Sequence, residues 1–275
     1  MRAIKAILVR NLTNLFRDKT RFFFTIFMSV FFLFIFSFVM KSAATGLDQP
    51  MNYLISGIII MTVFQAALNN SMGTLEDISS GFMKEILVAP ISRSQISIGQ
   101  ILSSSIIAVL QGVIVIIVGL FMGLNLDAIN LLKMLGVMIL VGVTFGSMGL
   151  FLATLAKNSS TFQIVIAVAV MPLTFLSGAY IPTTVMPEFL RLVVYINPLT
   201  YTTAIFRYIT LKMEGLTSAA LVKAGVAFDI YGFVITPALG LLAILAICLI
   251  FFLLCVNRFS KADFSNVKTF HHHNG

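Results

Sequence analysis

FFFTIFMSVFFLFIFSFVM, residues 22–40, is the stretch that decides the class of fold. It contains no charged residue, and its length matches the roughly 20 apolar residues that an α-helix needs to cross the hydrocarbon core of a membrane. We therefore expect an all-α integral membrane protein with six transmembrane helices. Five further stretches resemble the first in character and complete this set: about 51–72, 96–122, 131–155, 161–179 and 232–256.

The overall composition also favours a membrane protein over a soluble one. Hydrophobic residues make up 59% of the chain and charged residues 10%, whereas a soluble domain carries about 25% charged residues. A net charge of +8 would fit a protein that binds nucleic acid. The basic residues, however, lie at the ends of apolar stretches, where lysine and arginine orient membrane helices and contact anionic headgroups. We expect membrane lipids, and no nucleic acid, among the partners.

Residues 1–21 alternate basic and apolar positions, and the apolar ones recur at spacings of three and four. That spacing predicts a cytoplasmic amphipathic helix lying in the membrane interface; a disordered polybasic arm is the alternative. Residues 22–256 are then the transmembrane domain. Residues 257–275 are expected to be a cytoplasmic tail, in which His271 to His273 resemble a tag.

The segment 180–231 does not fit a plain span, because Pro182, Pro187 and Pro198 interrupt it. Its apolar pieces, residues 189–196 and 199–211, are each too short to cross a membrane. They predict re-entrant or interfacial helices between the fifth and sixth spans. Backbone at membrane depth that does not span must be shielded by protein or line a wet cavity. We therefore expect this segment to cap or gate a pathway.

Lysine and arginine predict the orientation of the chain. With both termini in the cytoplasm, the loops 73–95 and 156–160 lie inside and 180–231 lies outside, and the inner side carries most of the basic residues, as the positive-inside rule requires. We expect a multi-pass protein of a prokaryotic cell membrane. The inner residues are Arg2, Lys5, Arg10, Arg17, Lys19, Arg21, Lys84, Arg93, Lys157, Arg258, Lys261 and Lys268, and the outer ones are Lys41, Lys133, Arg191, Arg207, Lys212 and Lys223.

Side chains that carry chemistry are scarce in the predicted spans. None holds an ionisable residue deep inside it, which argues against a proton relay and so against a proton antiporter. Neutral polar side chains do occur in the spans. They either line a substrate path or form hydrogen bonds between helices. No GxxxxGK[ST] phosphate loop, catalytic triad or metal-ligand spacing is present. We expect neither an enzyme nor a cofactor, so energy for active transport must come from another chain. The candidate path residues are Gln65, Asn69, Asn70 and Gln111.

The longest polar break on the inner side is TLEDISSGFMKEILVAPISRS, residues 74–94. Its apolar positions Ile78, Phe82, Ile86 and Leu87 have helical spacing, and Pro90 is expected to end the helix. A mixed-charge amphipathic helix at this place is suited to docking on a soluble partner. A solvated loop between spans is the alternative.

Two stretches resemble the ABC type-2 permease family, and within it the daunorubicin-resistance-like exporters. Residues 76–99 resemble the cytoplasmic loop of that family, and PLTFLSGAYIPTTVMPEFLRLVVYINPLTYTTAIFR, residues 172–207, resembles its signature after the fifth span. The order of elements agrees over nearly the whole chain. The first match rests on Gly81, Phe82, Lys84, Glu85, Leu87, Ala89, Pro90, Ser92, Arg93 and Gly99, and the second includes Phe175, Pro187, Leu190, Leu199 and Thr200.

The resemblance implies a homodimeric permease that binds two copies of a P-loop ATPase, and this partner holds Mg-ATP. In such families the helix of the cytoplasmic loop couples the permease to the ATPase, and the broken external segment helps to gate the exit. The implied coupling residues are Glu76, Asp77, Phe82, Lys84, Glu85, Leu87, Pro90 and Arg93. The implied gate residues are Pro172, Ser177, Gly178, Pro182, Asn197, Pro198, Tyr201 and Arg207.

Substrates in the family include drugs, lipids, lipid-linked glycans, peptides and sodium. The expected function is therefore the export of a drug, a lipid or another amphipathic substrate out of the cytoplasm or inner leaflet. A permease for lipid-linked glycan or polysaccharide is the alternative within the family. Outside it, the alternatives are an ion-coupled secondary transporter and a membrane assembly factor without transport activity.

Overall fold

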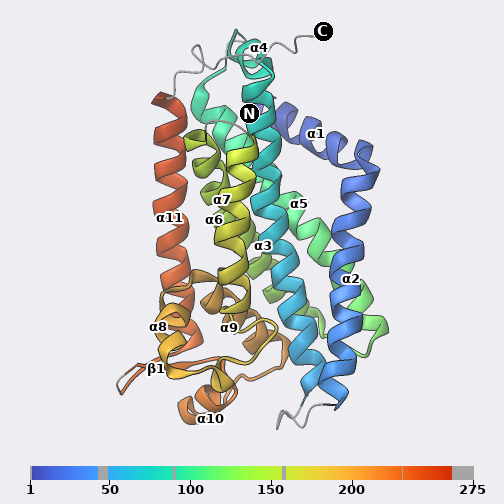
Figure 1. Cartoon of the computed structure of the whole chain (residues 1–275), viewed down its shortest axis with the longest axis vertical. Helices are drawn as coiled ribbons and strands as arrows, with labels where there is room; N and C mark the ends of the chain where they lie inside the picture. The colour runs from blue at the N-terminus through green and yellow to red at the C-terminus, as the bar shows by residue number, and fades with distance from the viewer. Residues whose placement is uncertain (1, 43–48, 89–90, 157–158, 231, 262–275) are drawn as a thin grey trace.

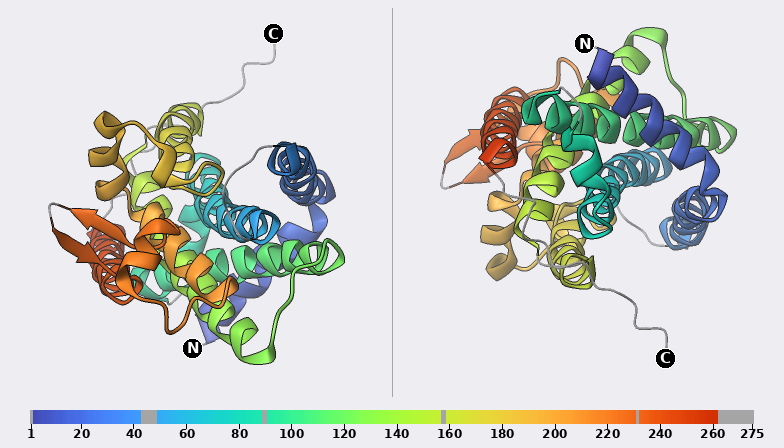
Figure 2. Two further views of the ribbon diagram at one scale, coloured as in Figure 1. Left: turned by 90° about the horizontal axis from the view of Figure 1, so that it is seen from below. Right: turned by 90° about the horizontal axis from the view of Figure 1, so that it is seen from above.

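The computed structural model describes residues 2–42, 49–88, 91–156, 159–230 and 232–261, and it is an elongated bundle of helices (Figure 1). Viewed down the bundle, α1 lies across one end instead of running along it (Figure 2). The helices of the bundle are α1 (Arg2–Arg17), α2 (Lys19–Ser42), α3 (Pro50–Ser79), α4 (Phe82–Val88), α5 (Arg93–Phe121), α6 (Ala128–Leu155), α7 (Ser159–Phe175) and α11 (Pro237–Lys261).

Short elements close the opposite end of the bundle. Here α8 (Glu188–Ile196) and α9 (Pro198–Thr210) are bent by 85° relative to each other, which confirms the two short helices predicted in the segment 180–231. The strands β1 (Phe228–Ile230) and β2 (Phe233–Ile235) form an antiparallel hairpin that the sequence analysis did not predict. The remaining elements at this end are the 3-10 turn η1 (Thr183–Val185) and α10 (Ser218–Lys223).

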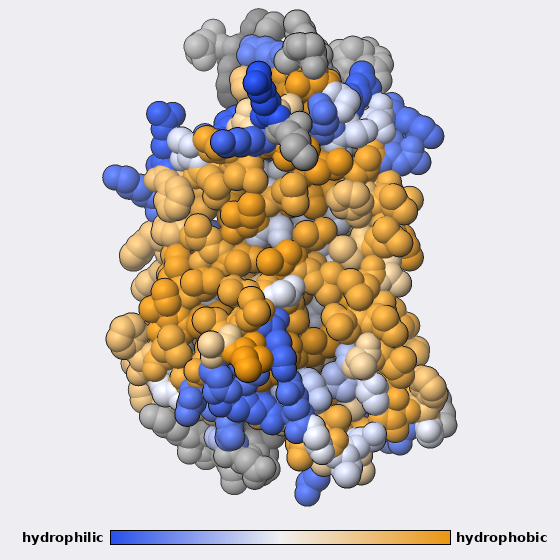
Figure 3. Space-filling model, turned by 180° about the vertical axis from the view of Figure 1, so that it is seen from behind, coloured by the Kyte–Doolittle hydropathy of each residue, from blue (hydrophilic) through white to orange (hydrophobic). Residues whose placement is uncertain are grey.

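The helices agree with an integral membrane protein. Among the described residues, α3, α5, α6 and α11 are each long and apolar enough to cross a membrane, and the number rises to 6 if the bent pairs α1–α2 and α8–α9 each count as one span. A continuous apolar band lies between two polar ends on the face shown in Figure 3. The all-α membrane fold is therefore confirmed.

The predicted fifth span is shorter than expected. Its helix, α7, ends at Phe175 instead of continuing to residue 179. The Ser177 hydroxyl donates to the Thr174 carbonyl and accepts from the Ala179 amide, and Gly178 adopts a φ of 81°. Because few residues other than glycine enter this left-handed conformation, the chain turns here and cannot extend the helix.

The centre of the bundle is formed by α3, α5 and α6, which pack closely because of glycine. A Cβ added at Gly142 of α6 would lie 2.7 Å from the Cα of Ser105 on α5, and one added at Gly146 would lie 2.9 Å from the Cβ of Ser104. Small residues four positions apart allow helix backbones to approach in this way. Phe64 of α3 packs edge-on against Phe145 of α6 beside this contact.

The cytoplasmic-loop helix differs from the prediction. Instead of one helix over the segment 74–94, α3 continues to Ser79, the chain turns at Gly81 with a φ of 84°, and α4 begins at Phe82. Apolar spacing continues across this turn, so periodicity alone does not reveal the break. Pro90, expected to end the helix, lies outside the described residues.

Candidate functional site

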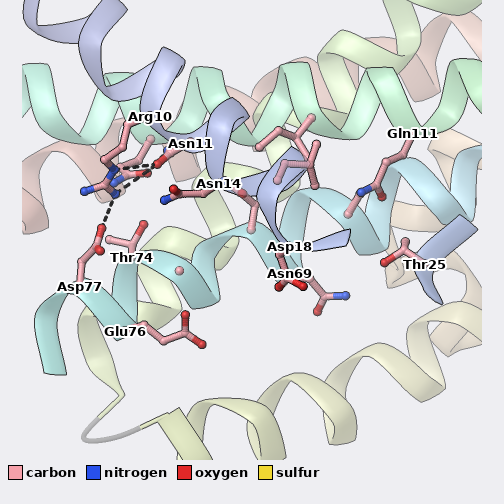
Figure 4. Close-up of a pocket in the computed structure, with 16 residues that line it drawn as sticks. Arg10, Asn11, Asn14, Asp18, Thr25, Asn69, Thr74, Glu76, Asp77 and Gln111 are labelled. Carbon is pink, nitrogen blue, oxygen red and sulfur yellow. Dashed lines mark hydrogen bonds and ion pairs between the residues drawn. The ribbon is translucent and has the colours of Figure 1, made fainter. Parts of the chain in front are cut away.

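A network of contacts joins four helices at the end of the bundle that carries α1 and α4, and Figure 4 shows the part of it around Arg10, Asn11 and Asp77. Arg10 of α1 forms an ion pair with Asp77 in the last turn of α3, and its guanidinium carbon lies 5.3 Å from the ring centre of Phe82 on α4. Arg10 Nη2 also donates to Asn11 Oδ1 at 3.1 Å. Asn11 Nδ2 donates to Gln100 Oε1 of α5 at 2.6 Å. We call these five residues the Arg10 network.

Apolar packing holds α1 in the position that the Arg10 network requires. Ile7 is 7% exposed and belongs to a buried cluster with Ile78, Ile96 and Phe259. A Cβ added at Gly99 of α5 would lie 3.2 Å from Ile7, so the glycine permits the close approach of the two helices. An amphipathic helix in the predicted place is thus present, and its polar face lies against protein as well as at the surface.

The predicted coupling residues lie at different places in the structure, and their exposure differs. Asp77 lies in the last turn of α3 and contacts Arg10, whereas Phe82 is 39% exposed and Glu85 is exposed on α4. Arg93 Nη1 donates to the Ser260 carbonyl at the end of α11, at 3.4 Å. Lys84 and Leu87 lie in α4, but their side chains are outside the described part of the structure.

A polar cavity of about 200 Å³ lies between α1, α3 and α5, next to the Arg10 network. Three predicted path residues, Asn69, Asn70 and Gln111, line it together with Glu76. Asn70 Nδ2 donates to Ser104 Oγ at 2.8 Å, as the alternative of hydrogen bonds between helices predicted. The hydroxyl of Thr74, the amide nitrogen of Gln100 and the amide oxygen of Gln111 are buried without a hydrogen-bond partner among the described residues.

An apolar cavity of about 830 Å³ adjoins the polar cavity and lies between α2, α3 and α7. The fourth predicted path residue, Gln65, lines it. Because the two cavities share lining residues, together they form one amphipathic chamber: aromatic at one part and polar at the other. The shared residues are Asp18, Thr25, Asn69 and Glu76, and the aromatic ones are Phe24, Phe32, Phe36, Phe162, Phe175 and Tyr180.

Arg207, one of the predicted gate residues, is buried inside the opposite end of the bundle. The sequence analysis assigned it to the outer side and did not predict its burial: the side chain is 1% exposed. Arg207 Nη2 donates to the carbonyls of Gly178 at 3.1 Å, Ala179 at 3.3 Å and Tyr53 at 3.4 Å. The guanidinium carbon lies 3.3 Å from the ring centre of Tyr53. Arg207 therefore fastens the turn after α7 to α3 and α9.

Other predicted gate residues surround this contact. Asn197 Nδ2 donates to the Leu173 carbonyl at 2.8 Å, while its Oδ1 accepts from the Leu199 amide and caps α9. The Tyr201 hydroxyl donates to the Tyr195 carbonyl at 2.6 Å. These hydrogen bonds connect α7, α8 and α9 to one another. Of the prolines, Pro172 lies inside α7, Pro182 precedes η1 and Pro198 begins α9.

A comparison with protein families identifies the chain. The model of the family described as ABC-2 type transporter matches residues 2–211, which include the Arg10 network, both cavities and the Arg207 contact. The chain belongs to the ABC-2 type transporter family. It is thus a permease subunit of an ABC transporter, as the resemblance of its two sequence stretches implied.

Curated relatives of this ABC-2 permease are themselves named as transport permeases. A chain of Pyropia yezoensis named transport permease ycf38 is 34% identical over 161 residues, which cover 57% of this chain and 55% of the relative. The ycf38 chain of Cyanophora paradoxa is 28% identical over 211 residues, covering 75% and 70%. The Escherichia coli protein YbhR, named as a multidrug ABC transporter permease, is 30% identical over 160 residues, covering 58% and 41%.

Sequence reasoning missed the roles of several residues of this permease. It treated Arg10 only as an orienting charge and did not single out Asn11, Gln100 or Tyr53. A signal for Arg10 was present, because Arg10 and Asn14 of α1 and Asp18, which directly follows α1, recur at intervals of four and mark a polar stripe. Tyr53 gave no such signal, because it acts through a ring face and a backbone carbonyl.

Proposed function

We propose that this permease exports a drug, a lipid or another amphipathic substrate from the cytoplasm or inner leaflet. The observation that carries the proposal is the amphipathic chamber. Its apolar cavity of about 830 Å³ falls within the roughly 300–1,000 Å³ of small-molecule sites, and it adjoins a polar cavity. Similarity to YbhR, named as a multidrug ABC transporter permease, favours this cargo class over lipid-linked glycan.

The proposal includes the assembly that the family implies: a homodimer of the permease with two copies of a P-loop ATPase that bind Mg-ATP. The face of α4 that carries Phe82 and Glu85 is the docking surface for this ATPase. Arg10 contacts both Asp77 of α3 and Phe82 of α4. A displacement of α4 by the ATPase would thus reach α1 and the helix that lines both cavities.

The orientation follows from the same assembly. The first helix, α4 and the C-terminal end of α11 lie at one end of the bundle (Figure 1), so a cytoplasmic α4 places both ends of the described chain in the cytoplasm. The segment 180–231, with Arg207 and its contacts, then lies on the external side as a gate. The excess of lysine and arginine at the α1 end supports this direction.

Reconstitution into proteoliposomes with the partner ATPase tests the proposal. We expect movement of a fluorescent amphipathic dye that requires both chains and hydrolysable ATP. Movement driven by an ion gradient without the ATPase would instead identify a secondary transporter. Stimulated ATP hydrolysis without movement of any dye or lipid would identify an assembly factor, and movement of lipid-linked glycan alone would identify the glycan exporter.

A further inference from the structure

Tyr180 connects the apolar cavity to the contacts of Arg207. Its side chain lines the cavity between α2, α3 and α7, and the residue is 7% exposed. The two residues that precede it, Gly178 and Ala179, carry carbonyls to which Arg207 donates at 3.1 Å and 3.3 Å. Tyr180 is therefore part of the cavity wall, while the backbone directly before it is held by Arg207.

Aromatic rings of α2 and α7 surround the Tyr180 ring. The ring centre of Phe36 lies 5.3 Å from that of Tyr180, and the two ring planes are inclined by 18°. The ring centres of Phe32 and Phe175 lie 5.9 Å and 6.1 Å from it. Aromatic pairs at such distances are favourable. Because these three phenylalanines also line the apolar cavity, an aromatic molecule bound there competes with Tyr180 for the same rings.

The backbone before Tyr180 is closely fixed, so a displacement of the ring is passed on to it. A Cβ added at Gly57 of α3 would lie 2.2 Å from the Ala179 carbonyl oxygen, which shows direct contact between this turn and α3. The Ala179 amide donates to the Ser177 hydroxyl at 3.2 Å. A shift of Tyr180 therefore moves the Ala179 carbonyl relative to Arg207.

From this arrangement we infer that Tyr180 couples the occupancy of the apolar cavity to the turn that Arg207 holds. Cargo that packs against Phe32 and Phe36 displaces the Tyr180 ring. The displaced residue draws the Ala179 carbonyl away from Arg207, and the turn after α7 detaches when cargo is present. Tyr180 is thus a positioning residue that acts through the Arg207 contact. This inference rests on the proposed export function and adds the regulation of its gate.

The reactivity of a cysteine at Ala179 tests the coupling in the purified full chain, without the ATPase and in a background without the native cysteines. The ligand is octylphenol, a neutral amphipathic aromatic molecule, at a concentration that saturates its displacement of the fluorescent dye N-phenylnaphthylamine. Ala179 is 0% exposed, so a maleimide reacts with this cysteine when the turn detaches. We expect the ligand to raise the labelling rate about three- to tenfold, the factor by which loss of an aromatic pair shifts a local equilibrium.

An unchanged labelling rate at saturation overturns the inference, and so does the absence of saturable binding of both molecules. A cysteine at Ala227, which is 2% exposed at the same end of the bundle, is the control for general loosening. Its labelling rate should not depend on the ligand. An equal rise at Ala179 and Ala227 would also overturn the inference.

Variants of Tyr180 separate the coupling from a purely structural role. Tyr180→Phe keeps the ring and should keep the response to the ligand, whereas in Tyr180→Ala the rates with and without ligand should agree within about twofold. The matched control is Phe189→Ala, at a side chain that is 78% exposed, and it should respond like the wild type. A Tyr180→Ala variant with an undiminished response overturns the inference. If Tyr180→Ala does not fold, the wild type and Tyr180→Phe still decide, because a missing response in either contradicts the coupling.

Transport measured on the same protein distinguishes this inference from the proposed function. ATP-driven movement of cargo by a permease whose turn does not respond to octylphenol would leave the export function intact and remove the coupling alone. A turn that responds to octylphenol in a permease that moves no cargo would support the coupling and contradict the export function.

Discussion

Replacing the buried Arg207 with methionine should destabilise the end of the permease opposite α1 far more than the same change at Arg191. Both are arginines of the segment 180–231, but Arg207 is 1% exposed while the Arg191 side chain is 46% exposed and pairs with Glu188. Methionine replaces the apolar stem of arginine as far as about Cδ and lacks the guanidinium group. The comparison therefore isolates the contacts of the guanidinium group.

The magnitude follows from those contacts. Without Arg207, the Gly178 carbonyl still accepts from the Tyr53 hydroxyl at 3.3 Å, but the Ala179 carbonyl loses its Arg207 bond. A buried carbonyl without a partner costs about 1–3 kcal/mol, and loss of a desolvated cation–π contact such as that with Tyr53 costs about 2 kcal/mol. Relief from burying a charge offsets part of this sum, so we expect a loss of about 2–4 kcal/mol for Arg207→Met. A surface pair such as Arg191–Glu188 contributes about 0–1 kcal/mol.

Reversible unfolding of the purified permease in mixed micelles measures both variants against the wild type. A second readout is the reactivity of a cysteine placed at Ala179, which is 0% exposed in the turn that Arg207 contacts and should become accessible only when this turn detaches. If Arg207→Met is no less stable than Arg191→Met and the turn stays protected, Arg207 does not fasten the turn after α7, and the argument from its three carbonyl contacts is wrong.

Three further predictions concern packing, coupling and orientation. Gly142→Ala should cost about 1–3 kcal/mol of stability by overpacking the contact between α5 and α6. Gly136→Ala, with no neighbour within 4 Å of the added Cβ, should be neutral. Equal effects of the two changes in thermal unfolding would contradict the packing argument. Arg10→Asp and Asp77→Arg should each reduce ATP-driven export, and the combined exchange should restore part of it; no recovery would mean that their ion pair is not the relevant contact. A single cysteine at Thr217, in a background without native cysteines, should react with an impermeant reagent from outside intact cells, and protection there with labelling only after lysis would reverse the proposed orientation.

Much of the fold follows from local sequence, because a membrane span requires a long apolar helix and little else. The stretches 96–122 and 131–155 are found as α5 and α6 within a few residues. The proline positions also placed α8 and α9 correctly, since proline restricts where a helix begins or continues. These are properties that a single segment expresses without its neighbours.

The features that escaped prediction depend on contacts between distant segments. Arg207 is buried because backbone carbonyls of Gly178, Ala179 and Tyr53 surround it, and carbonyl groups carry no sequence signal. The break at Gly81 was missed for a different reason: glycine there permits a turn without requiring one. The turn brings Met83 of α4 and Ile78 of α3 into the same cluster as Ile7, and this contact with α1 carries no local sequence signal.

The candidate site was predicted in part for the same reasons. Neutral polar residues inside apolar spans, such as Gln65 and Asn69, stand out in the sequence and do line the cavities. Their convergence with Asp18, which lies between α1 and α2, depends on the bend between these two helices and was not predicted. The roles of these residues in transport are still predictions.

The central claim is that α4 is the surface through which an ATPase drives this permease. The variant Phe82→Ala with Leu87→Ala tests it most directly, because interface energy concentrates in a few apolar side chains, and this change should cost about 2–4 kcal/mol of docking. Phe233→Ala at the opposite end, where the side chain is 63% exposed, is the matched control.

The measurement is co-purification with the partner ATPase together with ATP-driven transport, at equal levels of permease in the membrane. The account predicts that the double variant inserts normally, loses the ATPase and loses transport, while Phe233→Ala retains both. A double variant that inserts normally and exports at the wild-type rate would show that α4 does not couple the permease to its ATPase.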